Sequence, residues 1–81
     1  TLINNNMVTT HHIDAIRFTE NSLILKVDGK EYTFDLKKIS TKLFSATELQ
    51  KSLYTISPSG YGIHWPLIDE DLSIDSLLKS A

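Results

Sequence analysis

The fold is decided by the stretch Leu23–Phe34, which reads LILKVDGKEYTF. Apolar side chains occupy every second position on each side of Asp28 and Gly29, which is the period of a β-strand with one buried face. An Asp-Gly pair between two such runs is the strongest short-range signal for a β-hairpin, because glycine accepts the positive φ of a type I′ turn. The sequence therefore predicts two antiparallel strands joined at this turn.

A third strand precedes the hairpin. Residues Ile13–Phe18 alternate with one slip, which indicates a strand with a β-bulge, and the polar segment Glu20–Ser22 is typical of a turn. We therefore expect a three-stranded antiparallel meander. Because a small ribbon of strands is marginally stable alone, one of its faces must be covered, and we expect helices to cover it.

The helical cover is predicted from residue 37 onward. A 3–4 spacing of apolar side chains indicates a helix over 37–44; the side chains are Leu36, Ile39, Leu43 and Phe44. Thr47 and Gln50 have the spacing of a capping box, which predicts a second helix over 48–54 that buries Leu49 and Leu53. Ser73 is a candidate N-cap for a last helix.

Between these helices the chain is extended again. Residues 54–57 and 62–65 are strand-like and are separated by a loop that contains proline and glycine. The predicted fold class is α+β: a three-stranded meander, extended by a strand near 54–57 or 62–65 and packed by two or three short helices. Residues 13–81 form a single domain, and the polar, aperiodic residues 1–12 form a tail or an added edge segment.

The composition excludes several classes of function. The chain has 81 residues, a net charge of −2 and no cysteine. The lack of cysteine excludes a disulfide scaffold, a thiol nucleophile and a thiolate zinc site. The mild negative charge gives no general attraction for nucleic acid. No apolar run approaches the roughly 20 residues of a membrane-spanning helix, so we expect a cytoplasmic protein that does not bind membranes.

One loop carries candidate interaction residues. Tyr61, His64 and Trp65 lie close to two glycines, and aromatic side chains dominate the contacts of protein interfaces. The alternative is structural: Trp65 packs under the sheet, and a polar-tipped neighbour closes the core with one hydrogen bond. The structural interpretation is favoured for Trp65, whereas for Tyr61 and His64 the two are even. No nucleophile is visible for His64 to activate, so no catalytic residue is predicted.

An acidic stretch follows this loop. Its residues Asp69, Glu70 and Asp71 are candidate partner contacts, and a helix-capping role is the alternative. The stretch lacks the glycine and the closing carboxylate of a calcium loop, so neither a metal nor a cofactor is predicted. Lysines gather in the predicted helices at positions 37, 38, 42 and 51. A solvated helix face is the favoured interpretation, and a phosphate-binding face is the alternative.

Two strings in the later half are distinctive: Gly60–Pro66, which reads GYGIHWP, and Ile68–Ile74, which reads IDEDLSI. With the Asp-Gly hairpin before them and Leu77 and Leu78 after them, they resemble the bacterial domain of unknown function 2442 family. The resemblance covers residues 13–78 and implies a small α+β domain. It also implies occurrence alone, in front of a helix-turn-helix module, or beside a small companion protein in an arrangement similar to a toxin–antitoxin pair. The family offers no established catalytic residues to carry over.

From these observations we expect a non-enzymatic protein-interaction module, the antitoxin-like partner in a two-protein system. An acidic patch suits a small, nucleic-acid-binding, toxin-like companion, because it can occupy the site meant for phosphate. Direct binding of nucleic acid is then not expected.

The alternative function is a regulatory or ligand-sensing domain related to the N-terminal half of helix-turn-helix regulators. It would use a pocket under Trp65 or a nucleic-acid-binding face of lysines. An exposed edge strand also leaves self-association into a homo-oligomer open.

Overall fold

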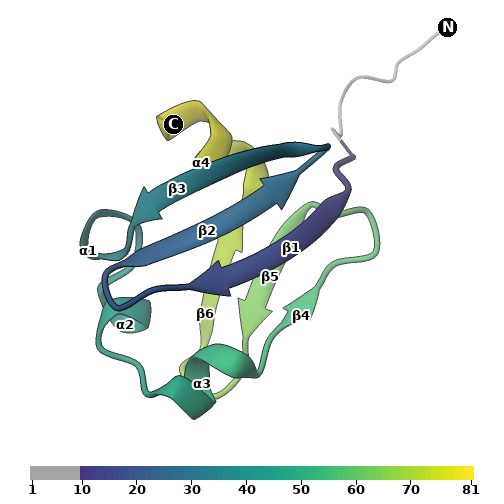
Figure 1. Cartoon of the computed structure of the whole chain (residues 1–81). Helices are drawn as coiled ribbons and strands as arrows, with labels where there is room; N and C mark the ends of the chain where they lie inside the picture. The colour runs from purple at the N-terminus through teal and green to yellow at the C-terminus, as the bar shows by residue number, and fades with distance from the viewer. Residues whose placement is uncertain (1–9) are drawn as a thin grey trace, which may run out of the picture.

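Two three-stranded antiparallel sheets, stacked face to face, make up the fold (Figure 1). The computed structural model describes residues 10–81. Sheet A contains, in spatial order, β1 (Ile13–Phe18), β2 (Ser22–Val27) and β3 (Lys30–Asp35). Sheet B contains β4 (Thr55–Ile56), β5 (Gly62–Trp65) and β6 (Glu70–Ser73). The helices of the described residues are α1 (Leu36–Ile39), α2 (Thr41–Phe44), α3 (Glu48–Ser52) and α4 (Ile74–Ser80).

The predicted meander is confirmed, including its turn and its bulge. Asp28 and Gly29 have φ angles of 52° and 83°, as a type I′ turn requires. The register of β1 against β2 shifts between Ile13 and Ala15. At this shift, the carboxylate of Asp14 accepts a hydrogen bond from the Gly29 N–H at 3.0 Å. The bulge therefore directs an acceptor onto the hairpin turn.

Sheet B, rather than a layer of helices, covers the inner face of the meander. Ile63 and Trp65 alternate inward from β5 and are fully buried. The ring of Trp65 packs against Phe18 of β1 and against Tyr54, with ring centroids 6.2 Å and 6.1 Å apart. The prediction that helices cover this face is wrong, because the strand-like segments near 54–57 and 62–65 form a sheet of their own instead of extending the meander. In that sheet β4 pairs with β5, and β5 pairs with β6. Helices of four or five residues such as α1, α2 and α3 are too short to cover that face.

The core between the sheets is continuous. Both sheets, α1, α2 and α4 contribute buried apolar side chains to it. They are Leu23, Leu25, Val27, Phe34, Leu36, Leu43, Ile63, Trp65, Ile74 and Leu77.

A break at Ser40 divides the helix predicted over 37–44 into α1 and α2. Ser40 is extended, with φ −165° and ψ 104°, and its N–H donates to the Leu36 carbonyl at the end of α1. Its Oγ accepts a hydrogen bond from the Leu43 N–H at 3.1 Å and so caps α2. The Ser40 hydroxyl also donates to the carboxylate of Glu70 in β6. A serine that serves as the cap of both helices ends α1 after one turn, because its side chain competes for backbone hydrogen bonds.

The capping box at the start of α3 is confirmed, but the predicted buried face of this helix is wrong. Thr47 Oγ1 accepts from the Gln50 N–H, and the Gln50 side chain accepts from the Thr47 N–H. Leu49 and Leu53, expected in the core, are 64% and 46% exposed.

Lys51 takes the inward position on α3. Its carbonyl accepts a hydrogen bond from the indole Nε1 of Trp65 at 3.1 Å. Its Nζ lies 5.4 Å from the centroid of the Phe18 ring. The backbone and the aliphatic stem of Lys51 therefore join α3 to the core, which turns the two leucines outward.

The last helix follows β6 directly, and Ser73 caps it as predicted, with its Oγ accepting from the Ser76 N–H at 3.3 Å. The predicted tail, residues 1–12, lies mostly outside the described residues. His12 nevertheless belongs to the folded domain, because its carbonyl accepts a hydrogen bond from the Asp28 N–H at 2.8 Å. No helix in residues 10–81 is long and apolar enough to cross a bilayer.

Candidate functional site

Tyr61, His64 and Asp71 remain accessible at sheet B. Tyr61 is 52% exposed, and the side chains of His64 and Asp71 are also exposed. The β5–β6 register places His64 opposite Asp71, and His64 Nδ1 lies 2.7 Å from Asp71 Oδ1. Two residues predicted as partner contacts are thus held together as a hydrogen-bonded pair.

A hollow of about 380 Å³ lies between Tyr61 and Asp71. Its lining comprises Ser57, Tyr61, Gly62, Ile63, Asp71, Leu72 and Ser73. Gly62 has no side chain to fill the space, and Ser57 fixes the rim because its Oγ accepts from the N–H groups of Tyr61 and Gly62 at 2.9 and 3.0 Å. Of the described residues that line this hollow, Asp71 is the only charged one. The hollow is therefore an apolar surface with one carboxylate at its border.

The acidic stretch divides into exposed and structural residues. Asp69 has a φ of 51° in the turn before β6, and its side chain is exposed. Glu70 instead accepts hydrogen bonds from the Ser40 hydroxyl and from the Asp71 N–H. Neither Asp69 nor Asp71 caps the last helix, so the capping alternative for them is wrong. Asp69 and Asp71 are left as the carboxylates that a partner can reach.

Trp65 contributes no surface for a partner, so the prediction that it contacts one is wrong. The side chain is fully buried, and its indole N–H is already bonded to the Lys51 carbonyl. The proposed pocket under Trp65 is corrected for the same reason, since Phe18 and Tyr54 pack against the ring.

The lysines of the helical middle do not form one basic face. Lys51 is buried, so the solvated-face interpretation is wrong for it. The Nζ of Lys37 lies 5.3 Å from the centroid of the Phe44 ring. The Nζ of Lys42 donates to the Asp69 carbonyl at 3.0 Å. These ammonium groups are therefore engaged in separate places.

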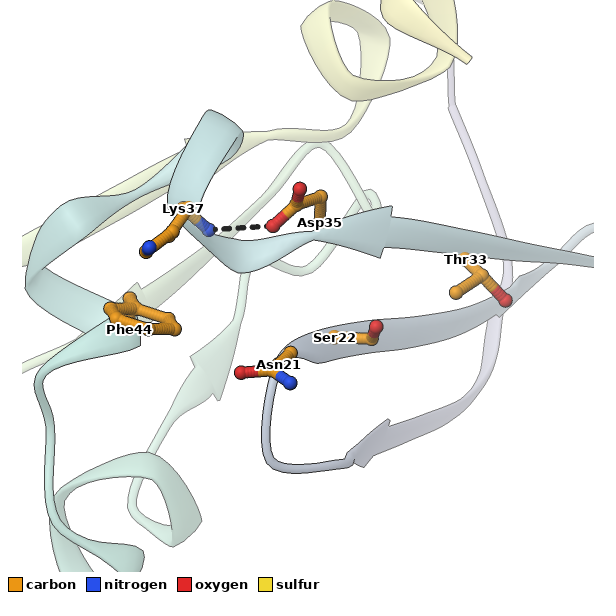
Figure 2. Close-up of a pocket in the computed structure, with 6 residues that line it drawn as sticks. All are labelled: Asn21, Ser22, Thr33, Asp35, Lys37 and Phe44. Atoms are coloured by element: carbon orange, nitrogen blue, oxygen red, sulfur yellow. Dashed lines mark hydrogen bonds between the residues drawn. The ribbon is translucent and has the colours of Figure 1, made fainter.

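A second, more polar hollow of about 580 Å³ lies where sheet A meets α1 and α2 (Figure 2). Its lining comprises Asn21, Ser22, Thr33, Asp35, Lys37 and Phe44. Figure 2 shows Asp35 at the end of β3, where its carboxylate accepts a hydrogen bond from the Lys37 N–H at 3.0 Å. This contact starts α1 directly after the strand and leaves the hollow beside the strand end. Sequence reasoning did not find this hollow, because its residues come from four elements.

Sequence reasoning also missed His11, which it assigned to the polar tail. The His11 side chain is only 7% exposed, and its Nδ1 and Nε2 lie 2.9 Å from Asp28 and 2.7 Å from Asp75. The hydrogen bond to Asp28 and then the one to Asp75 raise the pKa of His11, and the same contact with His11 lowers the pKa of Asp28. An imidazolium with both N–H groups donated to carboxylates has no nitrogen free for a substrate or a metal. Residues 10–81 contain no group of three or more His, Cys, Asp or Glu side chains placed to hold a metal ion.

Comparison with known proteins identifies the fold and the family. A protein of unknown function from Rhodospirillum rubrum ATCC 11170 has a crystal structure with a TM-score of 0.68 to this chain, at 24% sequence identity over 89% of each chain. No curated protein matches the chain. The family described as "Protein of unknown function (DUF2442)" matches residues 13–81. The chain therefore belongs to the DUF2442 family, as its GYGIHWP and IDEDLSI strings predicted.

Proposed function

We propose that this chain is a small non-enzymatic protein-interaction module, the antitoxin-like partner of a two-protein system. One observation carries the proposal: the exposed Tyr61 ring borders an apolar hollow whose single charged lining residue is Asp71. Exposed aromatic side chains beside a concave apolar surface are the type of residue that contributes most to protein interfaces. The corner formed by Tyr61, His64 and Asp71 is the surface offered to the partner, whereas Asp69 lies at the other end of β5 and β6, in the turn that joins them.

The hollow suits a lysine or arginine side chain of the partner. Its aliphatic stem would lie along the Tyr61 ring and the apolar floor, while its charged end meets the Asp71 carboxylate. Because an exposed ion pair contributes only about 0–1 kcal/mol, the packed stem supplies most of the affinity and Asp71 supplies the preference for a cation. The corner therefore selects a basic protein surface.

A basic surface on a small companion protein is suited to bind the phosphates of nucleic acid. A module that covers its lysines or arginines with Tyr61 and Asp71 would prevent that contact. This consequence supports the antitoxin-like role for the chain and a toxin-like role for the companion.

The same corner supports a binding function better than a catalytic one. Thr55 lies opposite His64 across β4 and β5, so threonine, histidine and aspartate form one row. Within residues 10–81, however, the Thr55 hydroxyl makes no hydrogen bond to the His64 imidazole, whose side-chain hydrogen bond is to Asp71. A nucleophilic hydroxyl needs a hydrogen bond to the base that activates it, so we assign Thr55, His64 and Asp71 to binding rather than to catalysis.

The test is capture of the partner from the source cell by the tagged chain, followed by affinity measurement with the purified partner. Tyr61→Ala should weaken binding about tenfold or more, and Asp71→Asn should weaken it a few-fold. Leu67→Ala is the matched control, since Leu67 and Tyr61 are both 52% exposed and Leu67 lies outside the hollow. Unchanged affinity in both corner variants would overturn the proposal.

A ligand-sensing function is the second candidate, because the hollow lies within the size range of about 300–1,000 Å³ for small-molecule sites. Its ligand would combine an apolar body with a cationic group that meets Asp71. A screen of such amines by NMR separates the two functions. A ligand that shifts the Tyr61 and Gly62 amides, with no protein captured, would favour sensing over partner binding.

A further inference from the structure

The four edge strands of the two sheets differ in how they are protected from pairing with another chain. The bulge at Asp14 interrupts β1, β4 has only two residues, and in β6 the Glu70 carboxylate accepts the Asp71 N–H. In contrast, β3 is six residues long, contains no proline and pairs with β2 without a shift. Bulges, short length and occupied amides are the usual protections of an edge, and β3 has none of them.

The hydrogen-bonding pattern shows which groups of β3 are free. The Leu36 N–H donates to the Asn21 carbonyl at 2.9 Å, which fixes the pattern of bonds between β2 and β3. In an antiparallel pair every second residue bonds to the neighbouring strand. Tyr32 and Phe34 therefore bond to β2, while the N–H groups of Glu31 and Thr33 point away from the sheet and take no partner within residues 10–81.

Two hollows lie beside this edge. Thr33 and Asp35 line the polar hollow of about 580 Å³ described above. They also line a further hollow of about 360 Å³, whose other lining residues are Phe34, Lys38, Ile39, Ser80 and Ala81. On the core side, the rings of Tyr32 and Phe34 stack with centroids 6.3 Å apart. An added strand would therefore meet apolar side chains on one of its faces and polar side chains on the other.

Charge decides between a second copy of this chain and a different partner. A pairing of β3 with itself that is centred on Thr33 uses the outward N–H groups of residues 31, 33 and 35 in both copies, and it places Glu31 opposite Asp35 of the other copy at both ends. Like charges directly opposite one another destabilise a strand pair. A strand with lysine or arginine at these positions meets opposite charges instead, although Arg17 already pairs with Glu31 at 3.0 Å on the exposed face.

We infer that β3 binds an extended segment of a protein partner by antiparallel strand addition. The segment alternates apolar residues, placed beside Tyr32 and Phe34, with polar residues that include lysine or arginine opposite Glu31 and Asp35. This surface lies on sheet A and is independent of the proposed Tyr61 corner on sheet B.

The probe for this inference is a short capped peptide in which lysines flank a central threonine and valine occupies the alternate positions. The peptide sequence reads the same in both directions, so the same side chains lie opposite β3 whichever way the peptide runs. With the isotopically labelled chain, we expect slowed amide exchange at Glu31 and Thr33 and little change at Tyr32 and Phe34, which already bond to β2.

N-methylation of the central threonine should weaken binding at least tenfold, because that N–H bonds to β3. N-methylation of a valine, whose N–H points away from β3, is the matched control and should preserve binding.

Variants of the chain complete the test. Thr33→Pro removes the central free donor at an edge position that tolerates proline. Glu31→Lys should abolish the preference over a peptide with glutamates for lysines, because either peptide then meets one like and one opposite charge. Tyr61→Ala should bind the peptide like the unmodified chain, which separates this surface from the proposed corner. If Thr33→Pro does not fold, the difference in binding between the two N-methylated peptides, measured with the unmodified chain, tests the inference instead. Equal binding of those two peptides, or a β3-paired dimer of the chain in sedimentation, would overturn the inference.

Discussion

The imidazole Nε2 of His11 lies 2.7 Å from a carboxylate oxygen of Asp75, in the first turn of α4. Its Nδ1 lies 2.9 Å from Asp28 in the β2–β3 turn. The His11 N–H also donates to the Ser59 carbonyl at 3.0 Å. One residue thereby links the start of sheet A, the hairpin turn, the loop between β4 and β5 and the last helix.

Replacing His11 by glutamine should lower the free energy of unfolding by about 1–3 kcal/mol near pH 6, because hydrogen bonds to charged groups contribute about 1.5–3 kcal/mol. Urea unfolding followed by the fluorescence of Trp65, the single tryptophan, measures this change. His12→Gln is the matched control, since among residues 10–81 the exposed His12 side chain pairs only with Asp14, at 3.0 Å. Its loss should be below about 0.5 kcal/mol. Equal losses in the two variants would contradict the linking role of His11.

The His11 contacts also predict how stability depends on pH. The pKa of His11 is raised above its ordinary value of 6.5, so its stabilising effect is fully present below pH 6.5 and is lost as the pH rises through the raised value. The pKa of Asp28 is lowered from 3.8, so its effect is present above pH 3.8 and is lost as the pH falls through the lowered value.

The stability difference between the unmodified chain and His11→Gln should therefore be largest between about pH 4 and about pH 6.5 and smaller on both sides. Urea titrations of both proteins across the pH range provide the measurement. A difference that stays constant up to pH 9 would show that the histidine is not held as a cation.

Two glycines with positive φ should respond differently to alanine. Gly60 has a φ of 69°, and a Cβ there would lie 1.9 Å from the His11 carbonyl oxygen. Gly29 has a φ of 83°, with no atom within 4 Å of the same position. Gly29→Ala should cost about 1–2 kcal/mol through backbone strain alone. Gly60→Ala should cost more than about 3 kcal/mol, because the loop and the His11 segment must also separate. Thermal unfolding ranks the two variants, and a smaller loss for Gly60→Ala would contradict the close approach.

Features set by neighbouring residues could be predicted from the sequence. The Asp28-Gly29 turn, the Thr47 capping box and the Ser73 cap each depend on contacts within a few residues, and all three were predicted correctly. The alternation at 63–65 also indicated the strand that carries Trp65 inward.

Features set by distant residues could not be predicted in this way. Leu49 and Leu53 have the spacing of a buried face, but the bond between the Lys51 carbonyl and Trp65 rotates α3 the other way. His11 lies 17 and 64 residues from the two aspartates that hold it, and no local pattern indicates such contacts. At the candidate site, the hollow beside Tyr61 requires the pairing of β5 with β6; the sequence indicated β5 as a strand but β6 only as an acidic stretch before the last helix.

Ser40 links the junction of α1 and α2 to β6 through Glu70, and its replacement tests that connection. Ser40→Ala removes the cap of α2 and the hydrogen bond to Glu70. We expect a loss of about 1–2 kcal/mol, as for other N-cap serines, plus a smaller loss from the carboxylate that is left without this donor. Ser45→Ala, at the exposed C-cap of α2, should change stability by less than about 0.5 kcal/mol. In the double variant Ser40→Ala with Glu70→Ala, the losses of the two single variants should sum to more than the loss measured for the double variant, because each single variant removes the same hydrogen bond. Strict additivity in urea unfolding would mean that the Ser40–Glu70 contact does not stabilise the packing of α2 against β6.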